Sequence, residues 1–304
     1  MTALALPPLR GRVAREAPLA PQTWFRVGGP AEALVRPADA EDLAAFLGAL
    51  APEMPVTVIG AASNLIVRDG GIPGVVLRLA GRGFGTITVE RDGVVAGAAA
   101  LDASVAEHAA AAGLAGLEFL SGIPGTIGGA VAMNAGAYGG DVASILDWAE
   151  VVTRGGELVR LPCPALGLSY RTARLPPGAV VVRARFRAAP GDSAAIAARM
   201  AEIKASREAT QPVRARTGGS TFRNPEGSRA WELIAAAGGR GLRMGDAQCS
   251  DKHCNFLLNL GTATATDLEN LGEEIRRLVR LMSGVQLEWE IRRFGIPSAM
   301  RAAA

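Results

Sequence analysis

The stretch that decides the fold is Ser121-Gly122-Ile123-Pro124-Gly125-Thr126-Ile127-Gly128-Gly129. Residues 122–129 include four glycines and a proline, so ordering this segment costs much conformational entropy. A backbone that must pass close to a flat ring or a phosphate explains that composition, because glycine has no side chain to hold a ligand away. The alternative is a tight crossover between two packed elements, which requires no ligand.

A second glycine-containing loop, Gly60-Ala61-Ala62-Ser63-Asn64, lies between two short apolar runs. These runs predict buried strands at Val56–Ile59 and Leu65–Val67. The backbone amides of the loop and its polar side chains suit a pyrophosphate. The loop matches neither the dinucleotide fingerprint nor the P-loop motif, and an ordinary β-turn explains it equally well.

A third segment reads Gly218-Gly219-Ser220-Thr221-Phe222-Arg223-Asn224-Pro225. Its two glycines allow a tight turn and close access to a ligand, and a hydroxyl, a guanidinium and an amide follow them. A Gly-Ser turn that enters a strand is the simpler interpretation. The sequence offers Ser220 no base in a defensible Ser/His/Asp order, which argues against a serine hydrolase.

The composition excludes several classes of protein. The chain has 304 residues, 49% of them hydrophobic, a formal net charge of +3 and only 5% aromatic residues, which gives little support to nucleic-acid binding. Three cysteines without a Cys-x-x-Cys pair and two histidines argue against a zinc site and fit reduced thiols in a cytosol. No long uncharged apolar stretch predicts a membrane span, and Met1–Pro8 lacks the features of a signal peptide. We therefore expect a cytoplasmic protein with no metal, nucleic-acid or membrane partner.

Helical and strand patterns interleave along the chain, which predicts an α+β fold. Asp92-Gly93 between two apolar runs predicts a hairpin, so the sheet is not purely parallel. Residues 1–20 read as an irregular leader, and Thr266-Asp267-Leu268-Glu269 reads as a capping box. The last strand is expected at Val285–Arg292, with Glu288 and Glu290 on one face. Helices are expected at about 39–50, 104–112, 192–209, 230–237 and 266–282.

Taken together, these segments resemble the UDP-N-acetylenolpyruvylglucosamine reductases of bacterial peptidoglycan synthesis, also called UDP-N-acetylmuramate dehydrogenases (the MurB family). The resemblance runs from about Thr23–Ala31 to Glu288–Gly295, nearly the whole chain, and its segments occur in the family's order. The most specific segments are Ser121–Gly129 with Met133–Tyr138, and Gly219–Pro225, supported by His253–Phe256 and Leu287–Gly295.

The resemblance implies a two-lobed FAD-binding module of the PCMH type, followed by a smaller α/β substrate-binding domain. The implied boundaries are residues 1–80 and 81–205 for the two lobes and 206–304 for the domain. The family binds FAD non-covalently, uses NADPH as its reductant, and acts on the small molecule UDP-N-acetylenolpyruvylglucosamine. In this chemistry a hydride from NADPH reaches C3 of the enolpyruvyl group through flavin N5. A monomer is expected.

The resemblance also implies roles for individual residues. Ser220 would be the general acid that protonates C2, while Arg171 and Glu290 would complete the catalytic site and stabilise the enolate. The implied cofactor contacts are Gly60, Ala61, Ala62, Ser63, Asn64, Leu65, Gly122, Ile123, Pro124, Gly125, Thr126, Gly128, Gly129, Asn134, Gly136 and Ala137. The candidates for substrate binding are Tyr170, Arg207, Arg223, Asn224, Lys252 and His253.

Three features depart from the family pattern. Ala62 stands where many members have glycine, which narrows the φ angle allowed there and bears on the phosphate contacts. Cys254 stands where a small residue is usual. No tyrosine-bearing insertion follows Arg171 before the strand at Val180, which is typical of the shorter subtype.

Two other functions remain open. One is a different flavoprotein of the same FAD-binding fold, such as an oxidase. The other is a nucleotide-sugar-binding module without enzymatic activity. The glycine run at 122–129 argues against the second, because binding a sugar nucleotide alone would not need it.

Overall fold

The computed structural model describes residues 4–302, which form two compact units. The first unit contains the described residues up to Arg15, together with Ala33–Ala61 and Gly74–Ser206. The second contains Glu16–Glu32, Ala62–Pro73 and the described chain from Arg207 onward. Each unit combines helices with sheets, which confirms the α+β prediction.

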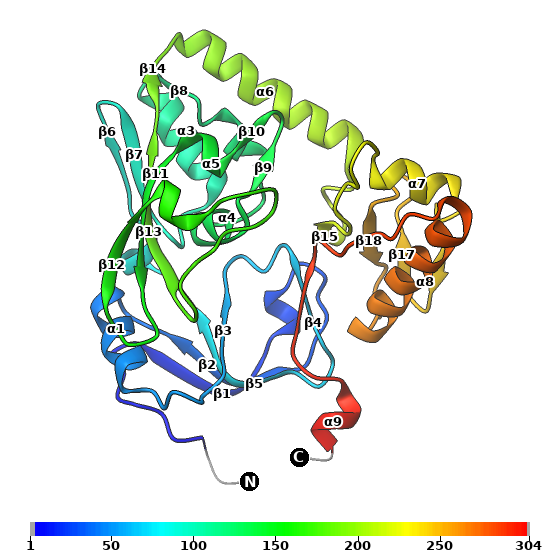
Figure 1. The fold of residues 1–304 in the computed structure, drawn as a ribbon, viewed down its shortest axis with the longest axis horizontal. Coiled ribbons are helices and arrows are strands. Elements are labelled where there is room, and N and C mark those ends of the chain that lie inside the picture. The colour runs from blue at the N-terminus through cyan, green and yellow to red at the C-terminus, as the bar shows by residue number, and fades with distance from the viewer. Residues whose placement is uncertain (1–3, 303–304) are drawn as a thin grey trace. The chain divides into compact units, whose positions relative to one another are not determined.

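The first unit is built around a five-stranded antiparallel sheet of order β12-β11-β13-β7-β6. The predicted hairpin is present, because Glu90 pairs with Gly93 across its turn. Figure 1 shows α3, α4 and α5 beside this sheet, and their apolar residues share one core with it. The elements are β6 (Ile87–Glu90), β7 (Gly93–Gly97), α3 (Asp102–Ala111), α4 (Ile127–Met133), α5 (Val142–Ile145), β11 (Leu146–Val152), β12 (Leu158–Pro162) and β13 (Val180–Arg187).

A four-stranded sheet of order β1-β2-β5-β3 includes the strand that precedes the Gly60 loop. Its strands are β1 (Arg12–Pro18), β2 (Pro30–Arg36), β3 (Val56–Ile59) and β5 (Ile72–Arg78). The parallel pairing of β3 with β5 fixes the point at which Gly60 leaves the sheet. Helix α1 (Ala40–Ala49) lies where a helix was expected. Asp39 caps it by accepting the amide of Asp42, and the helix buries Leu43, Phe46 and Leu47.

The expectation of an irregular leader at residues 1–20 is wrong for Arg12–Pro18, which forms β1. Six of the seven residues of β1 are exposed, so this edge strand carries no apolar alternation that a sequence pattern could reveal. Within Met1–Pro8, where the sequence shows no signal peptide, residues 1–3 lie outside the described part of the chain.

The second unit contains a four-stranded antiparallel sheet of order β15-β18-β17-β16, with α7 and α8 packed on it. Its elements are β15 (Arg216–Ser220), α7 (Ala230–Ala236), β16 (Arg243–Met244), β17 (Ala247–Cys249), β18 (Phe256–Asn259) and α8 (Ala265–Ser283). The predicted capping box is displaced by two residues: Thr264 caps α8 and exchanges hydrogen bonds with Asp267. Asp69 accepts the amides of Ala265 and Thr266. Thr266 therefore contacts Asp69 and does not cap the helix.

The predicted last strand, Val285–Arg292, is also wrong. Residues 285–291 form no strand apart from a single bridge between Phe222 and Trp289. Strand β19 (Arg292–Phe294) begins only afterwards and pairs in parallel with β4 (Leu65–Val67). Glu288 and Glu290 are therefore held by individual hydrogen bonds rather than by a continuous ladder.

The remaining elements are short or peripheral: α2 (Arg82–Gly85), β8 (Leu114–Ala115), β9 (Gly136–Ala137), β10 (Gly140–Asp141), β14 (Ala189–Pro190), α6 (Ser193–Thr210) and α9 (Ser298–Ala302). Helix α6 matches its predicted range closely. Among residues 4–302, no helix has both the length and the apolar character needed to cross a membrane. The same residues contain no group of three His, Cys, Asp or Glu side chains arranged to hold a metal ion.

Candidate active site

In the first unit, two of the predicted cofactor loops face each other. Gly60 follows β3, and Thr126 is the residue at which α4 begins. The Thr126 hydroxyl makes no capping bond to its own helix. A Cβ atom at Gly60 would lie 2.6 Å from the Thr126 hydroxyl oxygen, so a side chain at this position would not fit.

The glycine run is fixed to the chain segment that follows β7. The amides of Ile127 and Gly128 donate to the carbonyl oxygens of Ala100 and Ala98, at 3.0 and 2.9 Å. A Cβ atom at Gly128 would lie 2.9 Å from that of Ala98, whereas one at Gly129 would have its nearest described neighbour at 3.9 Å. The run is thus tightly packed on one side and leaves room at Gly129 on the other.

Asp102, in the first turn of α3, lies against Gly125. Its amide donates to the Gly125 carbonyl oxygen at 3.2 Å, and a Cβ atom at Gly125 would lie 2.6 Å from its carboxyl oxygen. The carboxyl group is completely buried and has no hydrogen-bond partner among the residues that the structure describes. This burial raises the pKa of Asp102 well above its usual value, because the charged form loses hydration. Burial therefore favours the neutral form of the carboxyl group that lies against Gly125.

Arg171 is attached to the third predicted cofactor segment. Its guanidinium donates to the Gly136 carbonyl oxygen at 2.8 Å and lies 5.0 Å from the centre of the Tyr170 ring. Asn134 ends α4 in a left-handed conformation and donates from its side chain to the Ser169 carbonyl oxygen at 2.9 Å. The turn that carries Arg171 is thereby held on the segment after α4.

In the second unit, Ser220 is the last residue of β15 and pairs with Phe256. The register of the pairing shifts between Thr217 and Ser220, where the two glycines lie. Gly219 has a φ of +78°, and a Cβ atom there would have no described neighbour within 4 Å, so this glycine supplies the turn and the open access. Ser220 is half-buried, and its hydroxyl makes no hydrogen bond within residues 4–302.

The backbone of Glu290 is joined to the residue after Ser220. The amides of Glu290 and Ile291 donate to the Thr221 carbonyl oxygen at 2.8 and 3.3 Å. The side chain of Asn64 donates to the Glu290 carbonyl oxygen at 3.3 Å. The second unit thus brings together a residue of the predicted pyrophosphate loop, the predicted proton donor and one predicted carboxylate.

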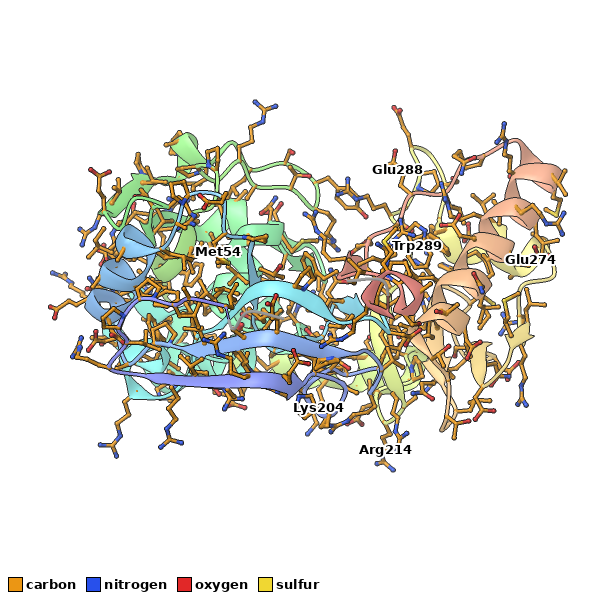
Figure 2. The ribbon with its side chains drawn as sticks, turned by 90° about the horizontal axis from the view of Figure 1, so that it is seen from below. Met54, Lys204, Arg214, Glu274, Glu288 and Trp289 are labelled. Carbon is orange, nitrogen blue, oxygen red and sulfur yellow. The ribbon has the colours of Figure 1, made fainter. Side chains whose placement is uncertain are left out.

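The two carboxylates that sequence spacing could not distinguish have different surroundings. Figure 2 shows Glu288 projecting outward from this unit, and its side chain is 75% exposed, with an oxygen 4.0 Å from the Arg223 guanidinium. Trp289 packs on Phe222, with ring centres 5.1 Å apart. Glu290 is half-buried, and its backbone carbonyl oxygen accepts the Asn64 side chain. Its role as the functional carboxylate remains a prediction.

Comparisons with known proteins decide the family. A model of the C-terminal domain of UDP-N-acetylenolpyruvoylglucosamine reductase matches residues 211–294, and a model of an FAD binding domain matches residues 31–162. The UDP-N-acetylenolpyruvoylglucosamine reductase of Acidiphilium cryptum (strain JF-5) is 69% identical over 293 residues, which cover 96% of this chain and 94% of the relative. The one from Granulibacter bethesdensis is 66% identical over 95% of this chain and 93% of its own.

The chain belongs to the UDP-N-acetylenolpyruvoylglucosamine reductase family. The crystal structure of the family's reductase from Thermus caldophilus superposes with a TM-score of 0.82 at 38% identity. That match covers 94% of this chain and all of the other. Membership confirms the resemblance seen in the sequence, an FAD-binding module followed by a second domain, and FAD as the cofactor.

The residues of the first unit fit the cofactor that the reductase family binds. The match to an FAD binding domain includes Gly60, the glycine run and Asn134. At Gly60 and Gly125 the side chains of Thr126 and Asp102 approach the place that a Cβ atom would take, whereas space remains at Gly129. In the second unit, Ala62 adopts a φ of +53°, so the residue that departs from the family's glycine retains the backbone conformation that glycine favours.

Several residues predicted to bind the substrate of the reductase have partners within the second unit. Lys252 donates to the Glu208 carbonyl oxygen at 2.5 Å, and the Asn224 side chain accepts the amide of Ala230 at 3.1 Å. Burial lowers the pKa of His253, whose ring packs 4.8 Å from that of Phe256. These contacts give the three residues structural roles, and their substrate roles remain predictions. The same holds for Tyr170, which is 51% exposed in the first unit, and for Arg207 and Arg223.

Two residues gained importance only in the structure. Asp102 occurs in an Ala-rich helix and gives no signal in the sequence, since its significance comes from burial beside Gly125. Asn255 lies within the family segment His253–Phe256, but the motif does not indicate what the residue does. Cys254, the unusual residue in that segment, is buried, and its carbonyl oxygen accepts the Cys249 thiol at 3.0 Å.

Proposed function

We propose that this chain reduces UDP-N-acetylenolpyruvylglucosamine to UDP-N-acetylmuramate for peptidoglycan synthesis, with Ser220, Arg171 and Glu290 as its catalytic residues. Family membership over nearly the whole chain supports the reaction. The observation that carries the residue assignment is the arrangement around Thr221, which joins the backbones of Ser220 and Glu290. When bound, FAD supplies the redox chemistry by which a hydride from NADPH is delivered to C3 of the enolpyruvyl group.

Ser220 supplies the proton. Hydride addition at C3 leaves an electron pair at C2, and a new C–H bond forms there as the Ser220 O–H bond breaks. The serine alkoxide then recovers a proton from solvent. A serine is a weak acid, but its hydroxyl here has no competing hydrogen bond within residues 4–302 and stands next to the open space at Gly219.

Arg171 and Glu290 act on the charge that develops at C2 and its carboxylate. A guanidinium keeps its positive charge throughout, so Arg171 stabilises the enolate electrostatically. Its hydrogen bond to Gly136 fixes one side of the guanidinium and limits its motion. Glu290, anchored by Asn64, orients the substrate or donates a hydrogen bond in its protonated form.

The chain's glycine-containing segments hold the cofactor. Gly60–Leu65 would contact the pyrophosphate, and Gly122–Gly129 with Asn134–Ala137 would line the remainder. Asp102 is buried against Gly125, and this burial raises the pKa of its carboxyl group and so disfavours a negative charge beside the run. The candidates for binding the nucleotide sugar are Tyr170, Arg207, Arg223, Asn224, Lys252 and His253.

The quaternary state and the cellular location belong to the same proposal. We expect a monomer in the cytoplasm, where the unpaired thiols of Cys163, Cys249 and Cys254 remain reduced. Light scattering of the purified protein tests the first expectation.

An anaerobic titration tests the function. The purified protein should show flavin absorbance, lose it on addition of NADPH, and regain it when UDP-N-acetylenolpyruvylglucosamine is added without oxygen. A colourless protein with no affinity for added FAD would support a nucleotide-sugar-binding module instead. Reduced flavin that oxygen reoxidises and this substrate does not would support an oxidase of the same fold.

A further inference from the structure

We propose that Asn255 is a positioning residue that holds the proton donor Ser220 in its reactive place. The proposal rests on the proposed function of Ser220 and adds a residue that does not itself touch the substrate. The hydrogen bonds that support this role all lie within the second unit.

Asn255 binds three backbone groups of the two residues that follow Ser220. Its carbonyl oxygen accepts the amide of Thr221 at 2.7 Å. Its side-chain oxygen accepts the amide of Phe222 at 2.9 Å, while its side-chain nitrogen donates to the Phe222 carbonyl oxygen at 2.8 Å. The carboxamide thus satisfies both polar groups of Phe222 at once, as a neighbouring strand would do.

The Asn255 side chain binds Phe222 just beyond the end of the pairing between β15 and β18. Strand β15 pairs with β18 at Ser220 and Phe256, after the irregular register at Gly218 and Gly219. A serine that follows two glycines has little local restraint of its own. Asn255 supplies that restraint from the C-terminal side, because the peptide that carries Ser220 is continuous with the groups that Asn255 binds.

Water cannot easily replace the carboxamide. Asn255 is 3% exposed, and Phe222 is 1% exposed. Removing the side chain would leave the amide and carbonyl of Phe222 buried without partners, which is unfavourable enough to make the backbone shift. A shift of that segment would move the hydroxyl of Ser220.

The same contact reaches the predicted carboxylate. Thr221, bound by Asn255 on one side, accepts the amide of Glu290 at 2.8 Å on the other. Phe222 forms a bridge with Trp289, the residue before Glu290. Asn255 therefore fixes the relative positions of the backbones of Ser220 and Glu290.

A tight turn holds Asn255 itself. The hydroxyl of Ser250 accepts the amides of Lys252 and His253 at 3.2 and 3.3 Å, and the amide of Asn255 donates to the His253 ring at 3.3 Å. The side chain therefore projects from a rigid support, which is what a residue that sets the position of another requires.

Asn259, the last residue of β18, offers a matched control close to Asn255 in the chain. It is also buried, donates to the Phe25 carbonyl oxygen at 2.7 Å, and accepts the amides of Gly261 and Ala263 at 2.8 and 3.2 Å. Its side chain makes the same kinds of bonds as that of Asn255 but binds no group in residues 220–222. Loss of either side chain should reduce stability, while only Asn255 should affect proton delivery.

The test compares Asn255→Ala, Asn255→Asp and Asn259→Ala as FAD-loaded enzymes in anaerobic stopped-flow experiments. We expect NADPH to reduce the flavin at the wild-type rate in all three. Reoxidation by UDP-N-acetylenolpyruvylglucosamine should slow by up to about 100-fold in Asn255→Ala, as for a misplacement near 1 Å. Its solvent deuterium isotope effect should rise, because proton transfer becomes more rate-limiting.

Two further readouts separate positioning from loss of stability. Protonation at C2 creates a stereocentre, so we expect Asn255→Ala to yield some of the opposite epimer and Asn259→Ala to yield a single one. Asn255→Asp keeps the acceptor for the Phe222 amide and loses the donor, so an intermediate rate is expected. If Asn255→Ala does not fold, the same measurements on Asn255→Asp test the proposal.

The proposal is overturned if the Asn255 variants match Asn259→Ala in reoxidation rate, isotope effect and product configuration. It is also overturned if they slow flavin reduction and reoxidation equally. A wild-type enzyme whose reduced flavin does not react with this substrate would overturn the proposed function instead, so the two failures are distinguishable.

Discussion

The backbone amide of Glu290 donates a hydrogen bond to the carbonyl oxygen of Thr221 at 2.8 Å. Because Thr221 follows Ser220 directly, this bond joins the backbone of Glu290 to the residue next to the predicted proton donor. The side chain of Asn64 donates a second hydrogen bond to the backbone of Glu290, at its carbonyl oxygen. The position of Glu290 is thus set by its backbone, and its side chain can be changed without removing these bonds.

Glu290→Gln should therefore retain the backbone arrangement and lose the function of the carboxyl group. We expect flavin reduction by NADPH to remain near the wild-type rate and reoxidation by substrate to slow on the order of 100-fold, as when one group that stabilises developing charge is removed. Glu288→Gln is the matched control, because its side chain is 75% exposed. Equal effects of the two substitutions on reoxidation would exclude a specific role for Glu290.

Ala62→Gly should stabilise the protein. Ala62 has a φ of +53° and is buried, and an L-residue other than glycine pays about 1–2 kcal/mol for this conformation. Part of the gain is lost because glycine has more freedom in the unfolded chain, so we expect a net increase of about 0.5–1 kcal/mol in the free energy of unfolding. Urea denaturation measures this free energy of unfolding. Ala61→Gly, whose residue has no positive φ, should give no increase, and a gain there as large as at Ala62 would refute the explanation.

Asp102→Asn should change how stability depends on pH. Burial raises the pKa of Asp102 in the folded protein, so the folded state holds a proton that the unfolded state releases above its ordinary pKa. The wild type therefore loses stability as pH rises from the unfolded pKa through the folded one, by about 1.4 kcal/mol for each pH unit crossed between them. Thermal unfolding of both proteins from pH 4 to 8 should show the variant gaining on the wild type with increasing pH.

Asp42→Asn is the control of opposite sign. Burial opposes ionisation of Asp42, but the amides of Ala38, Arg10 and Gly11 and the charge of Arg10 together lower its pKa. Its contribution is present above the unfolded pKa and is lost as pH falls through the folded one. The wild type should exceed Asp42→Asn in stability at neutral pH, and the two should converge in acid.

The Asp102 prediction is contradicted if the stabilities of the wild type and Asp102→Asn change in parallel with pH. Parallel curves would show that Asp102 is ionised in the folded protein.

Much of the fold could be predicted because its signals are local. Strands β3 and β4 were predicted with their observed bounds, since each is a short apolar run flanked by turn residues. Helix α8, expected to end at about residue 282, ends at Ser283, and the left-handed Gly284 caps it. Strand β1 was missed because its side chains are mostly exposed. The last strand was predicted wrongly because the apolar and charged alternation around Trp289 reflects packing on Phe222 rather than a ladder.

The chemistry of the candidate site could be predicted in part from motifs, but its support could not. Glycine-rich segments indicate where a cofactor comes close, because glycine has no side chain to keep a ligand away from the backbone. The bonds from Asn64 to Glu290 and from Asn255 to Phe222 join residues far apart in the sequence, and no local pattern encodes them. The same holds for the buried acid at Asp102, whose altered pKa depends on tertiary packing.

Ser220→Ala tests the central claim most directly. In an anaerobic stopped-flow experiment, the variant should be reduced by NADPH as fast as the wild type. Its reoxidation by UDP-N-acetylenolpyruvylglucosamine should be slower by about 100- to 10,000-fold, the range expected for loss of a general acid. Equal slowing of the two half-reactions, or an unchanged rate of reoxidation, would contradict the account of Ser220 as the proton donor.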